Sequence, residues 1–295
     1  MTEKITITGG TGFVGREICR HPALQSCEIQ VITRDASAAA ELLDQENVRF
    51  IEGELTDDRL LDETLAGSKA VIHLIGILNE KGDNGLGFDL VHHQLPRLLA
   101  NACVRSGVRR FVHMSALNAD ATAGSSYYLR SKGAGEDAVH ALEPQLQVTS
   151  FRPSVIFGPD DSFVNRFDQL LKLAPMMPLA CPEARFAPVY VGDVAERFVS
   201  AIDDASLHGQ RIELCGPREY SLIELVKYIA EAAGRSRMIF GLPDLASRMQ
   251  AGTLEYFPGK PFSLDNYRSL QTDSVCHCEQ REPTTLESIV PTYLG

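Results

Sequence analysis

A glycine-rich turn near the start of the chain constrains the fold more than any other feature of the sequence. Residues 8–15 read Thr-Gly-Gly-Thr-Gly-Phe-Val-Gly, between a β-rich run at 4–7 and a helical stretch at 16–20. In such a strand–turn–helix unit, one glycine permits the tight turn, another lets the backbone approach a pyrophosphate, and a third lets helix and strand pack closely. The N–H groups at the helix start then face the anion. The expected pyrophosphate contacts all come from this turn: Gly9, Thr11, Gly12, Phe13, Val14 and Gly15.

The first half of the chain alternates short apolar runs with helical stretches. The runs predict strands at Ile5–Thr8, Ile29–Thr33, Val48–Ile51, Ala70–Leu74, Arg110–Met114 and Gln147–Phe151. Helices are predicted between them, at Gly12–Arg20, Ser37–Leu43, Asp58–Leu65, Phe88–Arg105 and Ser131–Leu142. This βαβ rhythm predicts an α/β fold of the Rossmann type, a doubly wound parallel sheet with helices on both faces. The run at 70–74 is nearly all apolar, which places it at the centre of the sheet.

After Arg152-Pro153 the alternation loosens and prolines become frequent. We predict a helix at 193–203, a strand at 211–214, a helix at 222–233 and an irregular surface excursion at 241–285. The chain is therefore divided into a dinucleotide-binding domain, residues 1–154, and a smaller α+β lobe for substrate or partner, residues 155–295. The smaller lobe is expected over the strand ends, where sheets of this class bind ligands.

The end of the second predicted strand distinguishes the two dinucleotides. In NAD sites an acidic residue about 20 positions after the glycine turn bonds the ribose 2′-hydroxyl. Arg34 stands there instead, and a guanidinium pairs with a 2′-phosphate and stacks on adenine. The sequence thus favours NADP(H), while NAD(H) stays open because Asp35 follows directly.

Two further stretches suit a cofactor cleft because of their order along the chain. Glu54 and Leu55 follow the third strand, where they would reach the adenine. Leu74, Ile75 and Gly76 end the fourth strand, where a glycine lets the backbone approach the ribose.

A tyrosine and a lysine four residues apart form the candidate catalytic pair. Tyr128 and Lys132 share one face if the segment is helical. A lysine beside the phenol favours the phenolate, so the tyrosine would act as general acid or base. Ser115 ends the fifth strand, and its hydroxyl would orient a substrate carbonyl. Tyr127 precedes Tyr128, but it has no lysine at the fourth position after it.

Charge and hydropathy restrict the partners. The formal net charge of −11 disfavours nonspecific binding to nucleic acid or anionic lipid. No signal peptide is visible, and the longest apolar run, 70–78, is far shorter than the roughly 20 residues of a spanning helix. We therefore expect a cytoplasmic protein with a small-molecule partner.

The seven cysteines show no disulfide pattern, which is typical of a reducing compartment. Cys276-His277-Cys278 resembles a metal-binding tract, but no second ligand pair follows at a familiar spacing. We expect ordinary loop cysteines here and no metal.

The glycine turn together with Ser115, Tyr128 and Lys132 resembles the short-chain dehydrogenase/reductase superfamily in its extended or atypical, epimerase/dehydratase-like form. Three later stretches sharpen this resemblance: Ser131–Glu136, Phe151–Asp161 and Pro188–Ala195. They look like the branch that contains the nucleotide-binding accessory subunit of mitochondrial complex I and its bacterial relatives. One departure is Gly53-Glu54-Leu55, where related chains often carry Asp in place of Glu54.

The resemblance implies an NADP-binding, two-lobed protein. It implies Tyr128 and Lys132 near the nicotinamide ribose, and the backbone of Pro153, Val155 and Ile156 beside the nicotinamide. It suggests an NADPH-linked oxidoreductase or a redox accessory factor, with a quinone-related ligand, peripheral association with a membrane or respiratory complex, and a homodimer as options. The alternatives are a nucleotide-sugar epimerase or dehydratase with bound NAD, and a noncatalytic scaffold that the nucleotide stabilises.

Overall fold

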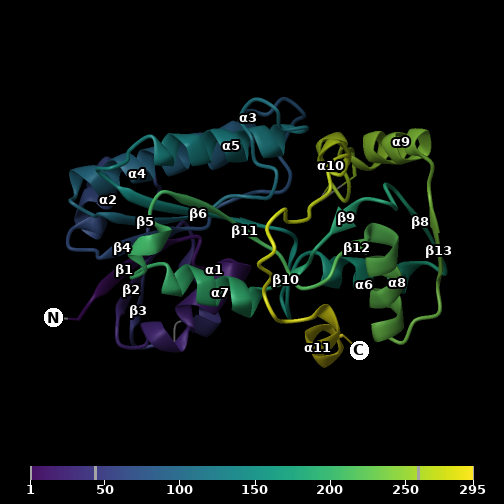
Figure 1. Cartoon of the computed structure of the whole chain (residues 1–295), viewed down its shortest axis with the longest axis horizontal. Helices are drawn as coiled ribbons and strands as arrows, with labels where there is room; N and C mark the ends of the chain where they lie inside the picture. Colours follow the sequence, from purple (N-terminus) through teal and green to yellow (C-terminus); the bar gives the residue numbers. More distant parts are fainter. Residues whose placement is uncertain (1, 43–44, 258–259, 295) are drawn as a thin grey trace.

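A seven-stranded parallel sheet forms the centre of the computed structural model, which describes residues 2–42, 45–257 and 260–294 (Figure 1). Its strands are β1 (Lys4–Thr8), β2 (Glu28–Thr33), β3 (Val48–Glu52), β4 (Ala70–His73), β5 (Arg110–Met114), β6 (Gln147–Pro153) and β11 (Gln210–Leu214). All neighbouring pairs are parallel, in the order β11-β6-β5-β4-β1-β2-β3. The predicted Rossmann-type fold is confirmed, with β4 at the centre. Chain order reverses between β1 and β4, and ligands bind at such a switch point.

Helices cover both faces of the sheet because successive strand residues point to opposite sides (Figure 1). Ile72 and Val112 face the core under α1 (Phe13–Cys19) and α7 (Val191–Ser200). Val71 and Phe111 face the opposite core. The helices of that second layer are α2 (Asp58–Leu65), α4 (Leu95–Arg105) and α5 (Tyr127–His140).

The helix before β5 contains a wide turn. α3 (Leu86–Asp89), a π-helical segment (Leu90–Gln94) and α4 follow one another without a break. The predicted helix at 88–105 is therefore present, but its first half is wound more loosely than an α-helix. Such π segments occur frequently at functional sites.

The chain beyond β6 builds a second lobe beside the carboxyl ends of the strands (Figure 1). It has three two-stranded sheets: β7 (Ile156–Phe157) with β10 (Val189–Tyr190), β9 (Arg185–Phe186) with β12 (Tyr220–Ser221), and β8 (Met176–Leu179) with β13 (Met238–Gly241). Its helices are α6 (Val164–Leu173), α8 (Leu222–Ala232), α9 (Asp244–Leu254), α10 (Leu264–Ser269) and α11 (Leu286–Ile289). Phe157, Leu171, Leu225 and Ile229 are central to a separate core there.

The two halves of the sequence are interleaved. β11 pairs with β6 and α7 packs on α1, so segments from beyond residue 154 complete the dinucleotide-binding layer. The proposed boundary between 154 and 155 stays a prediction.

Short 3₁₀ turns lie at Pro22–Leu24, Ala36–Leu42, Ala205–Leu207 and Val290–Thr292. The second of these replaces the helix predicted at 37–43, whose last residue lies outside the described residues.

Three expectations about helices are corrected. The helix predicted at 131–142 begins at Tyr127, because the Ser126 hydroxyl accepts a hydrogen bond from the Leu129 N–H and caps it. The helix predicted at 193–203 begins at Val191, and Asp193 lies in its first turn, where its carboxylate accepts hydrogen bonds from the N–H and hydroxyl of Thr284. The segment 241–285 is not irregular throughout, since α9 and α10 lie in it.

The expectation of unpaired cysteines is also wrong. Cys215, directly after β11, and Cys276 form a disulfide across 61 residues of sequence. No local spacing identifies such a pair, because only the packing of the C-terminal segment against the sheet brings the two together. Cys19, Cys27, Cys103, Cys181 and Cys278 are free.

Candidate active site at the switch point of the sheet

The glycine turn joins β1 to α1 at the reversal of strand order. Gly9 has φ +79°, a conformation that side chains other than glycine rarely adopt, and its carbonyl accepts a hydrogen bond from the Gly12 N–H at 3.0 Å. A Cβ on Gly15 would lie 2.3 Å from the Gly9 carbonyl oxygen, so the first turn of α1 packs directly on the loop. The roles predicted for Gly9 and Gly15 agree with this geometry.

The turn faces the end of β4. A Cβ on Gly9 would lie 3.1 Å from the Ile75 backbone nitrogen, so the two loops that flank the switch point touch. Below them, Thr8 Oγ1 and His73 Nδ1 are 2.6 Å apart and buried, which ties the ends of β1 and β4 together. The structure therefore brings the 9–15 and 74–76 segments together, as the sequence predicts.

Lys132 reaches the same loop from α5. Its Nζ donates a hydrogen bond to the Met114 carbonyl at 3.0 Å, and it would lie 3.2 Å from a Cβ on Gly76. Burial lowers the pKa of Lys132 to about 8, and the carboxylate of Glu136 opposes this shift. An ammonium thus stands beside the backbone segment predicted to meet the ribose.

Tyr128 lies in the first turn of α5, one helical turn before Lys132. Its ring meets the rings of Phe88 and His92 edge to face, with centroids 6.0 Å and 5.3 Å away. Burial raises the pKa of Tyr128 to about 12. The predicted lowering by Lys132 is not found, since burial is the cause of the shift and the Lys132 ammonium donates to the Met114 carbonyl. The phenol is protonated at neutral pH and able to donate.

Ser115 follows β5 and is buried. Its N–H donates to the Phe151 carbonyl at 2.8 Å, but its hydroxyl has no hydrogen-bond partner among the described residues. A buried hydroxyl without a partner is costly, and such groups are commonly completed by a ligand. This orphaned hydroxyl supports the predicted carbonyl-orienting role.

His92, on the π segment, is a site residue whose side-chain direction the sequence leaves undecided. Its Nε2 accepts a hydrogen bond from the Ile77 N–H at 2.9 Å, and its Nδ1 lies 2.9 Å from Ser131 Oγ. Because Nε2 accepts, the proton is on Nδ1 and the ring is neutral. Burial, with the positive charge of Lys132 second, lowers the pKa of His92 to about 2. The histidine thus fixes the 75–77 backbone without adding charge.

A glycine on α5 lets the π segment come this close. A Cβ on Gly135 would lie 1.7 Å from the His92 carbonyl oxygen, so no other residue fits without a backbone shift. The signal for this contact is present in the sequence as Gly133-Ala134-Gly135, but its partner lies about 40 residues earlier and is found only in the fold.

The buried histidines beside the site are neutral. His73 and His113 stack at 5.5 Å, and burial lowers the pKa of His73 to about 3 and that of His113 well below its ordinary value. Glu136 is fully buried but accepts from the Arg152 guanidinium through both oxygens. Arg152 is therefore paired with a structural acid.

The remaining predicted contacts lie around this centre with different exposures. Arg34 is exposed at the end of β2. Asp35 accepts from the Ser37 N–H and hydroxyl, and the hydroxyl and backbone bonds of Ser37 lower its pKa. Glu54 is exposed, whereas Leu55 is buried in the core, which leaves only its backbone for a ligand.

The segment after β6 connects the glycine turn to the second lobe. Pro153 is buried, and Val155 and Ile156 are half-buried in the strip that enters β7. A Cβ on Gly158 would lie 3.1 Å from the Phe13 ring, so the side chain of the glycine turn packs on this strip. The geometry brings the residues predicted for the nicotinamide end within reach of those predicted for the pyrophosphate.

We expect Lys132 to titrate near pH 8 rather than near its ordinary 10.5. Because unfolding restores the ordinary value, the unfolded chain binds more protons between pH 8 and 10.5, so this group makes the free energy of unfolding rise with pH over that window. NMR of ¹³Cε-labelled lysine would measure the titration, and the signal is assigned by its loss in Lys132→Met. A spectrum in which every lysine titrates at the ordinary value would contradict the expectation.

The donors and cradles present fit an NAD(P) dinucleotide. The glycine turn has no side chains over its backbone at 9, 12 and 15, the Lys132 ammonium lies beside Gly76, and the buried Ser115 hydroxyl has no partner among the described residues. Over the described ranges, no helix combines the length and apolar character needed to cross a bilayer.

Comparisons with known proteins agree with this geometry. Residues 5–215 match the model of the NAD dependent epimerase/dehydratase family. The chain is 33% identical over 244 residues to NADH dehydrogenase (ubiquinone) 1 alpha subcomplex subunit 9, mitochondrial, of Mus musculus; the match covers 81% of this chain but only 63% of the mouse protein. It is 31% identical over 242 residues to a ceramide reductase of Caulobacter vibrioides, covering 81% of this chain and 74% of that protein.

Solved structures support the fold. A UDP-glucose 4-epimerase from Thermus thermophilus, in complex with NAD, superposes with a TM-score of 0.69 over 91% of this chain and 99% of the other, at 21% sequence identity. At that identity the likeness concerns the arrangement of elements alone.

Proposed function

The chain belongs to the NAD dependent epimerase/dehydratase family, and on this premise we propose that it binds an NAD(P) dinucleotide along the switch point and reduces a carbonyl substrate with it. One observation carries the proposal. The buried Ser115 hydroxyl has no partner among the described residues, and Ser115 directly follows Met114, whose carbonyl accepts the Lys132 hydrogen bond. Lys132 and His92 lie beside Gly76, and the Tyr128 ring packs against His92.

The residues have separate tasks in this reaction. A bound nicotinamide supplies the hydride that the carbonyl carbon accepts. Ser115 donates a hydrogen bond to the carbonyl oxygen and orients it. Tyr128 gives its phenolic proton to that oxygen as the alcohol forms, and the phenolate takes a proton back from water. Lys132 holds the ribose side of the site, where its ammonium lies beside Gly76.

The substrate class is a lipid or quinone-like carbonyl. The name of the Caulobacter relative, ceramide reductase, supports a search among ceramide-type lipids.

Two measurements test the proposal. Mass spectrometry of the nucleotide released from freshly purified protein identifies the cofactor. NADPH oxidation is then measured with a ceramide-type ketone and with a quinone, and conversion of a nucleotide sugar is followed by chromatography of the products. Conversion of the sugar without net oxidation of NADPH would favour an epimerase or dehydratase instead.

A second candidate is a nucleotide-held subunit that does not turn over. The mouse relative is named as a subunit of an NADH dehydrogenase, which supports association with a respiratory complex. In such a subunit, the bound nucleotide would stabilise the folded state by mass action.

A homodimer is a separate possibility. Light scattering of the purified protein tests whether two copies of the chain associate.

The preference for NADP(H) is the finer part of the proposal. One carboxylate oxygen of Asp35 accepts from Ser37, whereas Arg34 is exposed directly after β2, where a guanidinium is available to a 2′-phosphate. We expect Arg34→Ala to weaken NADPH binding roughly 10- to 100-fold, the equivalent of a lost charged hydrogen bond, with NADH binding unchanged. Calorimetric titration with both nucleotides measures the difference.

Arg49→Ala is the matched control for that titration. Arg49 is an exposed arginine on the neighbouring strand β3, where it pairs with Glu28 away from the turn. The Arg49→Ala substitution removes the same charge, but it should leave the affinities for NADPH and NADH as in the wild type. Equal NADPH affinity in Arg34→Ala and Arg49→Ala would remove Arg34 from the site.

A further inference from the structure

We propose that Glu213, Cys215, Cys276 and Cys278 form a zinc site once the Cys215–Cys276 disulfide is reduced. This site is separate from the nucleotide cleft and does not depend on the proposed function. It joins the end of β11 to the C-terminal segment at 271–285, here called the strap, which runs between the lobes (Figure 1).

The ligand atoms already lie together. A carboxylate oxygen of Glu213 and the sulfurs of Cys276 and Cys278 are all within 4.8 Å of one another, and the Cys215 sulfur is bonded to that of Cys276. In a tetrahedral zinc site with bonds of about 2.3 Å, neighbouring ligand atoms are roughly 3.8 Å apart. The atoms of Glu213, Cys276 and Cys278 are therefore near this spacing already, and reduction frees the Cys215 sulfur, now bonded to that of Cys276, to turn toward the same point.

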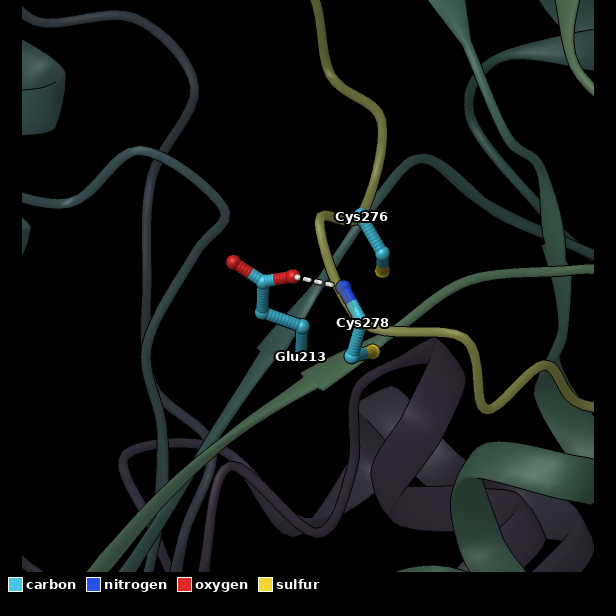
Figure 2. A group of neighbouring side chains, drawn as sticks. All are labelled: Glu213, Cys276 and Cys278. Carbon is cyan, nitrogen blue, oxygen red and sulfur yellow. Dashed lines mark hydrogen bonds between the residues drawn. The ribbon is translucent and has the colours of Figure 1, made fainter.

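Glu213 is held in place for this role by the strap itself. Its carboxylate accepts hydrogen bonds from the His277 N–H at 2.7 Å and from the Cys278 N–H at 3.4 Å, so it faces the Cys-X-Cys loop (Figure 2). Outer hydrogen bonds of this kind orient metal ligands. Cys276 is buried and Cys278 is exposed, which leaves an entry route on one side.

The charges and the donor chemistry fit zinc. Three thiolates and a carboxylate carry a charge of −4, which the ion reduces to −2. Arg281 adds a positive charge, since its guanidinium donates to the Cys276 carbonyl and lies 4.0 Å from the Cys278 sulfur. Soft thiolate ligands select zinc over magnesium or calcium.

The chemistry of formation is balanced. A dithiol reductant cleaves the Cys215–Cys276 bond, leaving two thiols on the protein and a disulfide on the reductant. Zinc then replaces the protons of three thiols, so binding releases up to three protons. Disulfide and zinc are thus alternative links between the strap and the sheet.

The link between the strap and β11 also affects the backbone segment after β6, which is predicted to lie beside the nicotinamide. Within the strap, the Ser274 carbonyl accepts hydrogen bonds from the Ser154 hydroxyl at 2.6 Å and from the Ala187 N–H at 3.1 Å. Ser154 directly follows Pro153, and its N–H donates to the Leu214 carbonyl at 2.9 Å. A fastened strap therefore holds the backbone between β6 and β7.

Cobalt titration of the full chain tests the site. After anaerobic reduction with a dithiol, which is then removed, we expect one equivalent of Co²⁺ to bind with a thiolate charge-transfer band, and Zn²⁺ to displace it. The protein with its disulfide intact should bind at least tenfold more weakly, as should Cys278→Ser and Glu213→Gln, whose changes lie at the surface end of the loop.

Cys181→Ser is the matched control, because Cys181 is a free, half-buried cysteine of the second lobe. It should bind cobalt as the wild type does. Absence of the band in the reduced wild type would overturn the proposal, as would unchanged affinity in Cys278→Ser or equal binding by the oxidised protein. Circular dichroism of each variant confirms that it is folded.

Discussion

Tyr128→Phe is expected to lower NADPH-dependent turnover by roughly 10²- to 10⁴-fold, the usual contribution of a positioned proton donor. Nucleotide affinity and stability should stay close to the wild type. The reason is that phenylalanine keeps the ring that packs on Phe88 and His92, while only the hydroxyl is lost. Stopped-flow turnover and fluorescence titration with NADPH separate the two effects.

This variant also divides the two candidate functions. Loss of turnover with intact nucleotide binding is the enzyme result, and Tyr127→Phe serves as its control because Tyr127 lies on the same helix, stacked under the Arg130 guanidinium. If cells carrying only Tyr128→Phe show full rescue of the deletion phenotype, the nucleotide-held subunit is favoured.

Gly135→Ala is expected to destabilise the protein by about 3 kcal/mol or more, at the upper end for overpacking, because the new Cβ meets a backbone oxygen rather than a movable side chain. It would lie 1.7 Å from the His92 carbonyl, so the π segment must leave α5. The same displacement withdraws His92 from the Ile77 N–H and should weaken nucleotide binding. Chemical denaturation measures the loss.

Gly252→Ala, also within a helix, is expected to stabilise the protein rather than destabilise it. Gly252 lies inside α9, and a Cβ there would meet only Leu264 Cδ2 at 3.9 Å. We expect a gain of about 0.5–1 kcal/mol from helix propensity and the less flexible unfolded chain. A Gly135→Ala protein as stable as Gly252→Ala would show that the helix–π-segment contact is not required.

The local parts of the site were predictable from sequence because they depend on short-range rules. The eight residues of a glycine turn between a strand and a helix are enough to predict a nucleotide-binding loop. The spacing of Tyr128 and Lys132 places them on one helical face wherever the helix packs. The alternation of strands and helices then predicts the switch point, because the loops that follow parallel strands all lie at the carboxyl edge of the sheet.

Other parts depend on residues that are distant in sequence. Ser126 moved the start of α5 back to Tyr127, and Asp265, from α10, accepts from the N–H groups of Tyr127 and Tyr128 to hold that end. Lys132 donates to the Met114 carbonyl, and burial raises the pKa of Tyr128, which the sequence predicts to be lowered. Burial decides such shifts, and it is a property of the packed molecule.

The sequence by itself determined the α/β class, and it predicted the nucleotide turn and the residues proposed for the chemistry, because these follow from patterns only a few residues long. Only the tertiary structure decided that His92 joins the site, that Arg152 pairs with Glu136, and that Cys215 meets Cys276. Those contacts join segments between 15 and 61 residues apart, and chain connectivity does not specify which distant groups meet until the cores are packed.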